Sequence, residues 1–270
     1  MSKPEAPERK SSEFFDSLRK GALVGLALLV LIVPPLRIMK NKHAQEQQQA
    51  SVQRAPAAPP DVPGPGKGGL RLADFSGEDP SAEARQVANW AVYTGDFKKH
   101  AFVIVDKADA RVYVFGPDGK LKDSAPALLG AAHGDDTYPG VGDKPLNQVK
   151  EYEKTTPAGR FVAEPGRNSG GEDVVWVDYN AAVSMHRIRP LVASERRLER
   201  LASRTIEDNR ISFGCINLPV SFYEDTLSPM VHKYGAIIYV LPEVKTAQQV
   251  FGAYDVTGQQ QGLQQVALHK

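Results

Sequence analysis

The sequence predicts a mainly β domain with short helices, and two patterns lead to this fold class. Between residues 101 and 188, short runs of β-branched and aromatic residues alternate with turn-forming residues, which is typical of strands joined by short connections. Before them, a set of apolar residues recurs at the spacing of one helical face: Ala84, Val87, Ala88 and Ala91. With 41% hydrophobic and 24% charged residues, the chain has the composition of an ordinary globular protein.

Each element can be placed in order along the chain. Asp79 and Pro80 form an N-cap and first-turn pair, which predicts a helix over residues 80–94. Residues 117–120 predict a turn, because proline fixes φ and Gly119 can take the left-handed conformation. Strands are expected at residues 101–106, 111–116, 121–132, 174–179, 182–188 and 236–241. Further helices are expected at residues 194–201, capped by Ser194, and at 219–234, with a break at Pro229.

An apolar run near the N-terminus predicts a membrane segment. Residues 21–33 read GALVGLALLVLIV, and with the flanking Arg37 and Lys40 the stretch 21–39 can cross a bilayer. We expect an uncleaved transmembrane signal-anchor here, preceded by a cytoplasmic segment at residues 1–20. The alternative is a cleaved signal peptide, although no small-residue cleavage pattern directly follows the run. Basic residues lie on both sides of the run, so its flanking charge does not orient it.

Composition divides the rest of the chain into three parts. Residues 40–75 are rich in Gln, Ala, Pro and Gly and poor in aliphatic residues, which predicts a disordered linker. A folded domain is expected over residues 76–243, followed by a polar C-terminal tail at 244–270. Within the domain, the glycine- and proline-rich stretch 134–152 is either a plain loop or a flap over a cleft.

Cys215 is the only cysteine of the chain, which excludes an internal disulfide and a CxxC metal or redox motif. It is either a small buried hydrophobe or a reactive group. Gly214 can take the positive φ that a strained nucleophile turn often requires. Ser212 and Asn217 offer hydrogen bonds on either side of the thiol. Arg210 offers a positive charge that would lower the pKa of the thiol.

Two motifs resemble the L,D-transpeptidase (YkuD-like) family. The signature of that family, Ser-His-Gly-Cys-aliphatic-Asn/Arg, is matched at Ser212, Gly214, Cys215, Ile216 and Asn217. Phe213 stands where that family usually has His. Upstream, residues 156–161 (TPAGRF) resemble its Thr-Pro-x-Gly-x-Phe element, whose role there is structural. The resemblance implies a β-sandwich catalytic domain over residues 76–243.

The same resemblance implies roles for individual residues. Cys215 would be the nucleophile, and His186, on the expected strand 182–188, would be the general base and acid. The backbone carbonyl of Arg187 would orient the His186 ring, and the N–H groups of Gly214 and Cys215 would form an oxyanion hole. Cys215 lies 29 positions after His186, a longer separation than is usual in that family. No metal or organic cofactor is implied.

By resemblance, the protein would be an L,D-transpeptidase that acts on peptidoglycan stem peptides through a thioacyl-enzyme intermediate. It would be a single-pass protein of the bacterial inner membrane with its catalytic domain in the periplasm, or a secreted periplasmic protein if the signal is cleaved. The alternatives are a cysteine hydrolase of the cell wall (an L,D-carboxypeptidase or crosslink endopeptidase) and a catalytically inactive wall-binding module. A formal net charge of +1 gives no field that would attract nucleic acid.

Overall fold

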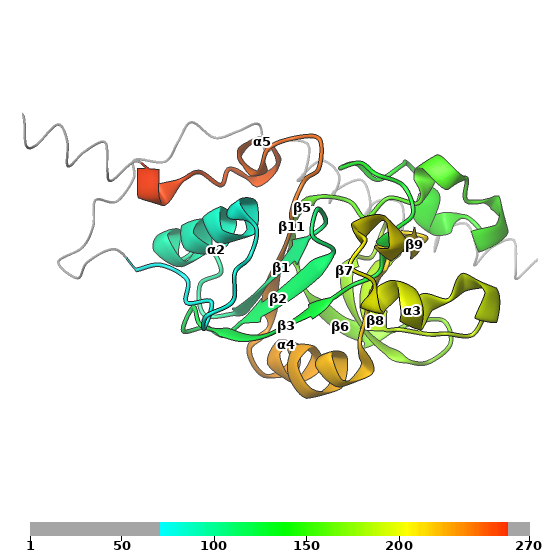
Figure 1. The fold of residues 1–270 in the computed structure, drawn as a ribbon, viewed down its shortest axis with the longest axis horizontal. Coiled ribbons are helices and arrows are strands. Elements are labelled where there is room, and N and C mark those ends of the chain that lie inside the picture. Colours follow the sequence, from blue (N-terminus) through cyan, green and yellow to red (C-terminus); the bar gives the residue numbers. More distant parts are fainter. Residues whose placement is uncertain (1–70, 259–270) are drawn as a thin grey trace, which may run out of the picture. The chain divides into compact units, whose positions relative to one another are not determined.

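The computed structural model of the protein describes residues 71–258 (Figure 1). The expected cytoplasmic segment 1–20, the signal-anchor 21–39 and residues 40–70 of the expected linker lie outside the described residues. Within residues 71–258, no helix has the length and apolar character needed to span a membrane.

A five-stranded sheet forms one layer of the fold. Its central strand β1 (Ala101–Asp106) runs parallel to β11 (Ala236–Val240), and the other neighbours are antiparallel. The strand order is β3 (Leu121–Pro126), β2 (Arg111–Phe115), β1, β11 and β5 (Gly159–Val162). Both faces of β1 are buried, because alternate side chains point to opposite faces: Val103 and Val105 enter one core, and Phe102 and Ile104 enter another.

A four-stranded sheet forms the second layer. Its order is β10 (Ile216–Leu218), β8 (Val183–Arg187), β7 (Asp173–Asp178) and β6 (Glu164–Arg167), with β10 and β8 parallel. Met185 and Ile216 from this sheet share one hydrophobic core with Val103 and Val105 of the first sheet. The mainly β fold and the two sheets packed over a common core agree with the expected sandwich. A further parallel ladder joins β4 (Leu129–Gly130) to β9 (Arg210–Ser212).

Helices cover the outer face of the five-stranded sheet (Figure 1). In α2 (Ala82–Thr94), Trp90 meets the ring of Tyr239 edge to face at 5.9 Å. The N-cap of α2 is Ser81, whose hydroxyl accepts a hydrogen bond from the Ala84 N–H. The helix therefore begins slightly later than the Asp79–Pro80 pair predicted.

Packed residues continue beyond the expected limits of the folded domain at both ends. Phe75 is buried against the rings of Tyr113 and Phe115, so the fold already includes the end of the expected linker. At the other end, α5 (Ala247–Phe251) and the residues that follow it pack on the same core, and Val256 is buried. The polar composition of these segments did not indicate that they pack on the domain. A few apolar side chains are enough to hold such a segment against the face of a sheet that has already formed.

Connections between the strands contain short helical turns. The third strand ends at Pro126, earlier than the expected residue 132, and the chain continues into β4. The loop over residues 134–152 and its end hold 3₁₀ turns at Val141–Asp143, Leu146–Gln148 and Glu151–Glu153.

The segment between β8 and β9 contains α3 (Arg197–Ala202), with 3₁₀ turns at Ala193–Glu195 and Ile206–Asn209. Arg196, in the left-handed conformation, occupies the N-cap of α3 in place of the expected Ser194. After β10, a π-helical turn at Phe222–Leu227 leads into α4 (Ser228–Tyr234), with Pro229 in the first turn of α4. The helix type changes close to the expected break at Pro229.

Candidate active site

Strand pairing brings Cys215 and His186 to the same face of neighbouring strands. In the parallel β10–β8 ladder, Ile216 pairs with Met185 and Asn217 pairs with His186. Ile216 and Met185 point into the core. Because side chains alternate along a strand, Cys215 and His186 both point to the opposite face, diagonally across the ladder. Cys215 is partly exposed, in contrast to the alternative of a buried core residue.

The thiol of Cys215 contacts β8 and the residue before it. Its Sγ lies 3.4 Å from the carbonyl oxygen of Ala182 and 3.7 Å from the hydroxyl oxygen of Ser184. In the described part of the chain, no hydrogen bond joins the Cys215 Sγ to the His186 ring. Catalytic hydrogen bonds are often long in ligand-free structures.

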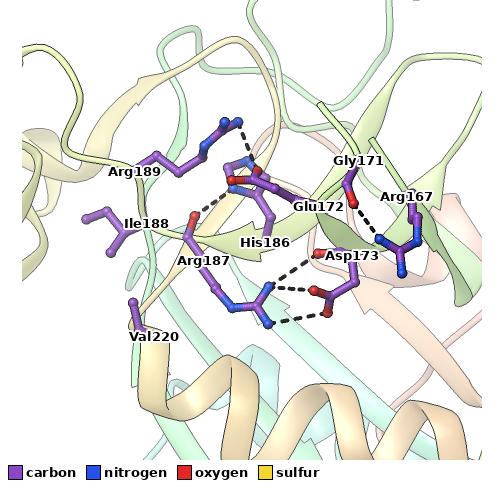
Figure 2. A pocket seen from close by; sticks show the side chains of 9 residues that line it. All are labelled: Arg167, Gly171, Glu172, Asp173, His186, Arg187, Ile188, Arg189 and Val220. Carbon is purple, nitrogen blue, oxygen red and sulfur yellow. Dashed lines mark hydrogen bonds and ion pairs between the residues drawn. The ribbon is translucent and has the colours of Figure 1, made fainter. Parts of the chain in front are cut away.

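The ring of His186 is oriented by the backbone of the next residue. Its Nδ1 lies 2.8 Å from the carbonyl oxygen of Arg187 (Figure 2). A carbonyl oxygen only accepts hydrogen bonds, so Nδ1 carries the proton and Nε2 presents a lone pair. Burial lowers the pKa of His186 below its usual 6.5, and the charges of Arg189 and Arg197 lower it further, against the opposing effects of the Arg187 carbonyl and Glu172. The neutral ring is the form that accepts a proton.

The loop before the thiol requires a glycine and is anchored from behind. Gly214 has φ +122°, and a Cβ at this position would lie 2.8 Å from the carbonyl oxygen of Thr155. The buried hydroxyl of Thr156 donates to the Gly214 carbonyl at 2.9 Å and accepts from the Gly130 N–H at 2.9 Å. The Thr-Pro-x-Gly-x-Phe element therefore holds the loop in place through Thr156, a contact that sequence reasoning did not identify.

Ser212 closes the same loop from the other side. Its Oγ accepts from the Gly214 N–H at 3.0 Å and donates to the Cys215 carbonyl at 2.6 Å. The Gly214 N–H is thus occupied, whereas the Cys215 N–H has no partner among the described residues. Of the two N–H groups expected to form an oxyanion hole, the Cys215 N–H is the available one in this arrangement.

Asn217 links the thiol segment to the long connection between β8 and β9. Its side-chain Nδ2 donates to the Cys215 carbonyl at 3.2 Å, and its Oδ1 accepts from Nη1 of Arg197 at 2.9 Å. Nε of Arg197 in turn donates to Glu195 at 2.5 Å. The charged pattern of residues 194–201 favours a solvated helix face, with contact between its arginines and substrate carboxylates as the alternative, so the sequence did not place Arg197 and Glu195 beside Asn217.

Arg210 lies away from the thiol. Its guanidinium forms an ion pair with Glu243 and donates to the Lys107 carbonyl at 2.9 Å. Lys107 forms ion pairs with Asp135 and Glu243. We call Lys107, Asp135, Arg210 and Glu243 the buried ion cluster. The partners of the Arg210 guanidinium are therefore Glu243 and the Lys107 carbonyl, and no bond joins it to Cys215 among the described residues.

Phe213 stands where the L,D-transpeptidase motif has His, and its ring lies under the ammonium group of Lys154. Nζ of Lys154 lies 4.4 Å from the centroid of the Phe213 ring and 2.6 Å from a carboxylate oxygen of Glu151. A cation over an aromatic face is attracted by the ring quadrupole. The aromatic ring beside Gly214 therefore holds a positive charge near the thiol loop without itself being able to titrate.

A pocket of about 380 Å³ opens beside His186 (Figure 2). Arg187 bridges Asp173 and Glu224, and Arg189 pairs with Glu172. The pocket is lined by Arg167, Gly171, Glu172, Asp173, His186, Arg187, Ile188, Arg189 and Val220. No group of His, Cys, Asp and Glu side chains in the described part of the chain is placed to hold a metal ion. The site thus offers a thiol, a neutral imidazole and a charged pocket next to that imidazole.

Comparisons with known proteins give matches among solved structures alone, since no family model and no curated protein matches the sequence. A mutant L,D-transpeptidase of Enterococcus faecium is 18% identical, with a TM-score of 0.30, over 53% of this chain and 50% of that one. The E. faecium L,D-transpeptidase catalytic domain acylated by ertapenem is 20% identical, with a TM-score of 0.31, over 53% of this chain and 98% of that one.

The helical cell shape determining protein Pgp2 of Campylobacter jejuni is 20% identical, with a TM-score of 0.36, over 62% of this chain and 58% of that one. The chain spans about half the length of the first E. faecium enzyme. Over these portions, it is similar to several L,D-transpeptidase catalytic domains.

Proposed function

We propose that the protein is a cysteine-dependent L,D-transpeptidase that acts on peptidoglycan stem peptides. The observation that carries this proposal is the placement of Cys215 and His186 on one face of the β10–β8 ladder, with Nδ1 of His186 bonded to the Arg187 carbonyl. The imidazole is therefore presented with its proton-accepting nitrogen free. A thiol beside such a base is the arrangement of a nucleophile and its general base.

The proposed reaction has two half-reactions. Nε2 of His186 takes the proton of Cys215, and the sulfur attacks the carbonyl of the bond between the L- and D-centred residues of the donor stem. The C–N bond breaks, the leaving amine takes the proton from His186, and a thioacyl-enzyme remains. An acceptor amine then attacks the thioester carbonyl and loses a proton to His186, and the C–S bond breaks to restore the thiol. Water in place of the amine gives hydrolysis.

The Cys215 N–H is the donor available for the negative charge on the carbonyl oxygen in each tetrahedral intermediate. One such donor contributes on the order of 3 kcal/mol to the rate in other acyl-transfer enzymes. Its direction is fixed because the Cys215 carbonyl is held by Ser212 and Asn217 and the Gly214 carbonyl is held by Thr156. The loop is therefore set before substrate arrives.

The proposal places the enzyme outside the cytoplasm. Stem peptides of peptidoglycan lie beyond the inner membrane, and a signal-anchor at residues 21–39 followed by a linker would carry the domain there. Cleavage after the apolar run would instead release the same domain into the periplasm.

Incubation of the full chain with tetrapeptide-stem muropeptides and an isotopically labelled acceptor stem tests the proposal. We expect a crosslinked product that contains the label, detected by mass spectrometry, and its loss in Cys215→Ala and His186→Gln. His232→Gln is the matched control, because His232 is exposed and bonds only within α4.

The outcome also separates the alternatives. Shortened stems or cleaved dimers without labelled product would identify a hydrolase and overturn the transfer step. Binding to peptidoglycan without any product would identify a wall-binding module.

A further inference from the structure

The segment between β8 and β9 reaches into the candidate site through one side chain. We infer that Arg197 is a positioning residue that fixes Cys215 and His186 relative to one another. The inference rests on the proposed roles of these two residues, and it extends the site to a part of the chain that neither motif includes.

A continuous series of hydrogen bonds runs from Arg197 to the nucleophile. Nη1 of Arg197 donates to Oδ1 of Asn217 at 2.9 Å, and Nδ2 of Asn217 donates to the Cys215 carbonyl at 3.2 Å. Asn217 is 1% exposed, so its amide has no water to replace a lost partner. Because the amide oxygen accepts from Arg197, the amide NH₂ must face Cys215. Without Arg197, the buried Oδ1 of Asn217 would lose its partner, and only the bond to the Cys215 carbonyl would hold the amide.

The same asparagine lies against the proposed base. Asn217 pairs with His186 in the β10–β8 register, so the side chain that Arg197 holds occupies the position next to the imidazole. Arg197 thus acts on both groups through a single buried amide. Its own side chain is only 13% exposed and is held by Glu195, which limits the positions available to its guanidinium.

Charged groups surround His186 from several elements. Arg187 and Arg189 follow it along the chain, Glu172 and Asp173 come from the start of β7, Arg167 comes from β6, and Arg197 comes from α3. Arg187 and Arg189 are paired with carboxylates that line or border the pocket. The charge of Arg197 is one of the causes that lower the pKa of His186. Loss of Arg197 is therefore expected to raise that pKa as well as to release Asn217.

The fold provides a matched control in the preceding residue. Arg196 is the N-cap of α3, with φ +50°, and its guanidinium has a different partner from that of Arg197. The Arg196 side chain is 69% exposed, and its ion-pair partner among the described residues is Glu199 of α3. A substitution of Arg196 removes the same charge from the same segment without touching Asn217.

The experiment compares Arg197→Met, Arg197→Lys and Arg196→Met in the full chain. Its readouts are the rate at which iodoacetamide alkylates Cys215, measured against pH, and the titration of His186 followed by NMR. We expect Arg197→Met to slow alkylation about tenfold at neutral pH, the size of one lost hydrogen bond to a charged group. We also expect it to move the titration of His186 to higher pH. Arg196→Met is expected to match the wild type in both.

Arg197→Lys separates charge from geometry. Lysine keeps the charge but lacks the planar fork that bonds Asn217 and Glu195 together. It should restore the titration of His186 and leave the alkylation rate low. Equal alkylation profiles for Arg197→Met and Arg196→Met would overturn the inference. If Arg197→Met does not fold, the alkylation profiles of Arg197→Lys and Arg196→Lys are compared instead, and equal profiles would again overturn the inference.

Failure of the inference can be told from failure of the proposed function. Iodoacetamide needs no substrate-shaped cleft, so the alkylation result does not depend on the reaction that the enzyme performs. A protein that forms no product from muropeptides and still shows the Arg197 effect would refute the function and keep the positioning role.

Discussion

Two groups of charged side chains flank the thiol segment, and they differ in how far water reaches them. In the buried ion cluster, the side chains of Lys107 and Asp135 are 0% and 1% exposed. In the pocket beside His186, the side chains of Arg187 and Asp173 are 29% and 45% exposed. Buried ion pairs are costly to break because an unpaired charge remains away from water, whereas exposed pairs contribute little to stability. The first group therefore stabilises the fold, whereas the second remains accessible from solvent.

The bonds of the buried ion cluster explain its place in the fold. The carboxylate of Asp135 accepts backbone N–H bonds from Glu243, Val244 and Lys245. The ammonium of Lys107 donates to the carbonyls of Gly134 and Thr156. The cluster thus joins the start of the 134–152 loop, the element that anchors Gly214 and the segment after β11.

Replacement of Lys107 should have the largest effect on stability. Lys107→Met leaves Asp135 and Glu243 as buried carboxylates without their ammonium partner, and we expect the free energy of unfolding to fall by about 3–5 kcal/mol. Urea denaturation measures the change. A loss below about 1 kcal/mol would show that the cluster behaves like a surface pair.

Thr156→Val should have the next largest effect, because it removes both hydrogen bonds of the Thr156 hydroxyl and leaves the Gly130 N–H and the Gly214 carbonyl unsatisfied. We expect a loss of about 1–3 kcal/mol in unfolding free energy together with slower alkylation of Cys215. Thr155→Val is the control, since the Thr155 hydroxyl has no hydrogen bond within the described residues. If both substitutions changed the unfolding free energy and the alkylation rate equally, the result would contradict the anchoring role assigned to Thr156.

The pH dependence of Cys215 reactivity should follow His186. Burial and the charges of Arg189 and Arg197 lower the pKa of His186, so at pH 6.5 the ring is mostly neutral and able to accept a proton. As the pH falls through that lowered pKa, the His186 ring becomes protonated, and the rate at which a carbapenem acylates Cys215 drops. Rate measurements across pH 4–8 should place this acid limb below 6.5, and the limb should vanish in His186→Gln. An acid limb above 6.5 would contradict the burial of the ring.

Glu224→Gln should have the smallest effect on stability. It breaks the Arg187–Glu224 pair, which is partly exposed, and Arg187 keeps Asp173 as a partner. We expect a change of less than about 1 kcal/mol in the free energy of unfolding. A loss comparable to that of Lys107→Met would erase the distinction between the two groups of charges.

The parts of the fold that the sequence predicted are those in which local pattern and packing agree. The strand at residues 101–106 was found because its β-branched and aromatic residues are buried on both faces, and Gly214 was singled out because a positive φ is a local property. Phe75 and Val256 were missed because each lies in a polar segment and finds its core partners far along the chain.

Charged side chains of the site could not be assigned for a similar reason. Arg210 was expected near the thiol from its position in the sequence, but its partner Glu243 lies 33 residues away. Arg197 reaches Asn217 across 20 residues. A long cationic side chain can turn to either side of its backbone, and the carboxylates that decide the direction come from other elements.

The proposed reactivity of Cys215 is tested most directly by the intact mass of the full chain after incubation with a carbapenem. Carbapenems acylate L,D-transpeptidases as a group, and that is the family which the motifs around Thr156 and Cys215 resemble. We predict one covalent adduct on the wild type, none on Cys215→Ala, and much slower formation on His186→Gln. An unmodified wild type, with Cys215 also inert toward iodoacetamide, would contradict the assignment of this thiol as a nucleophile.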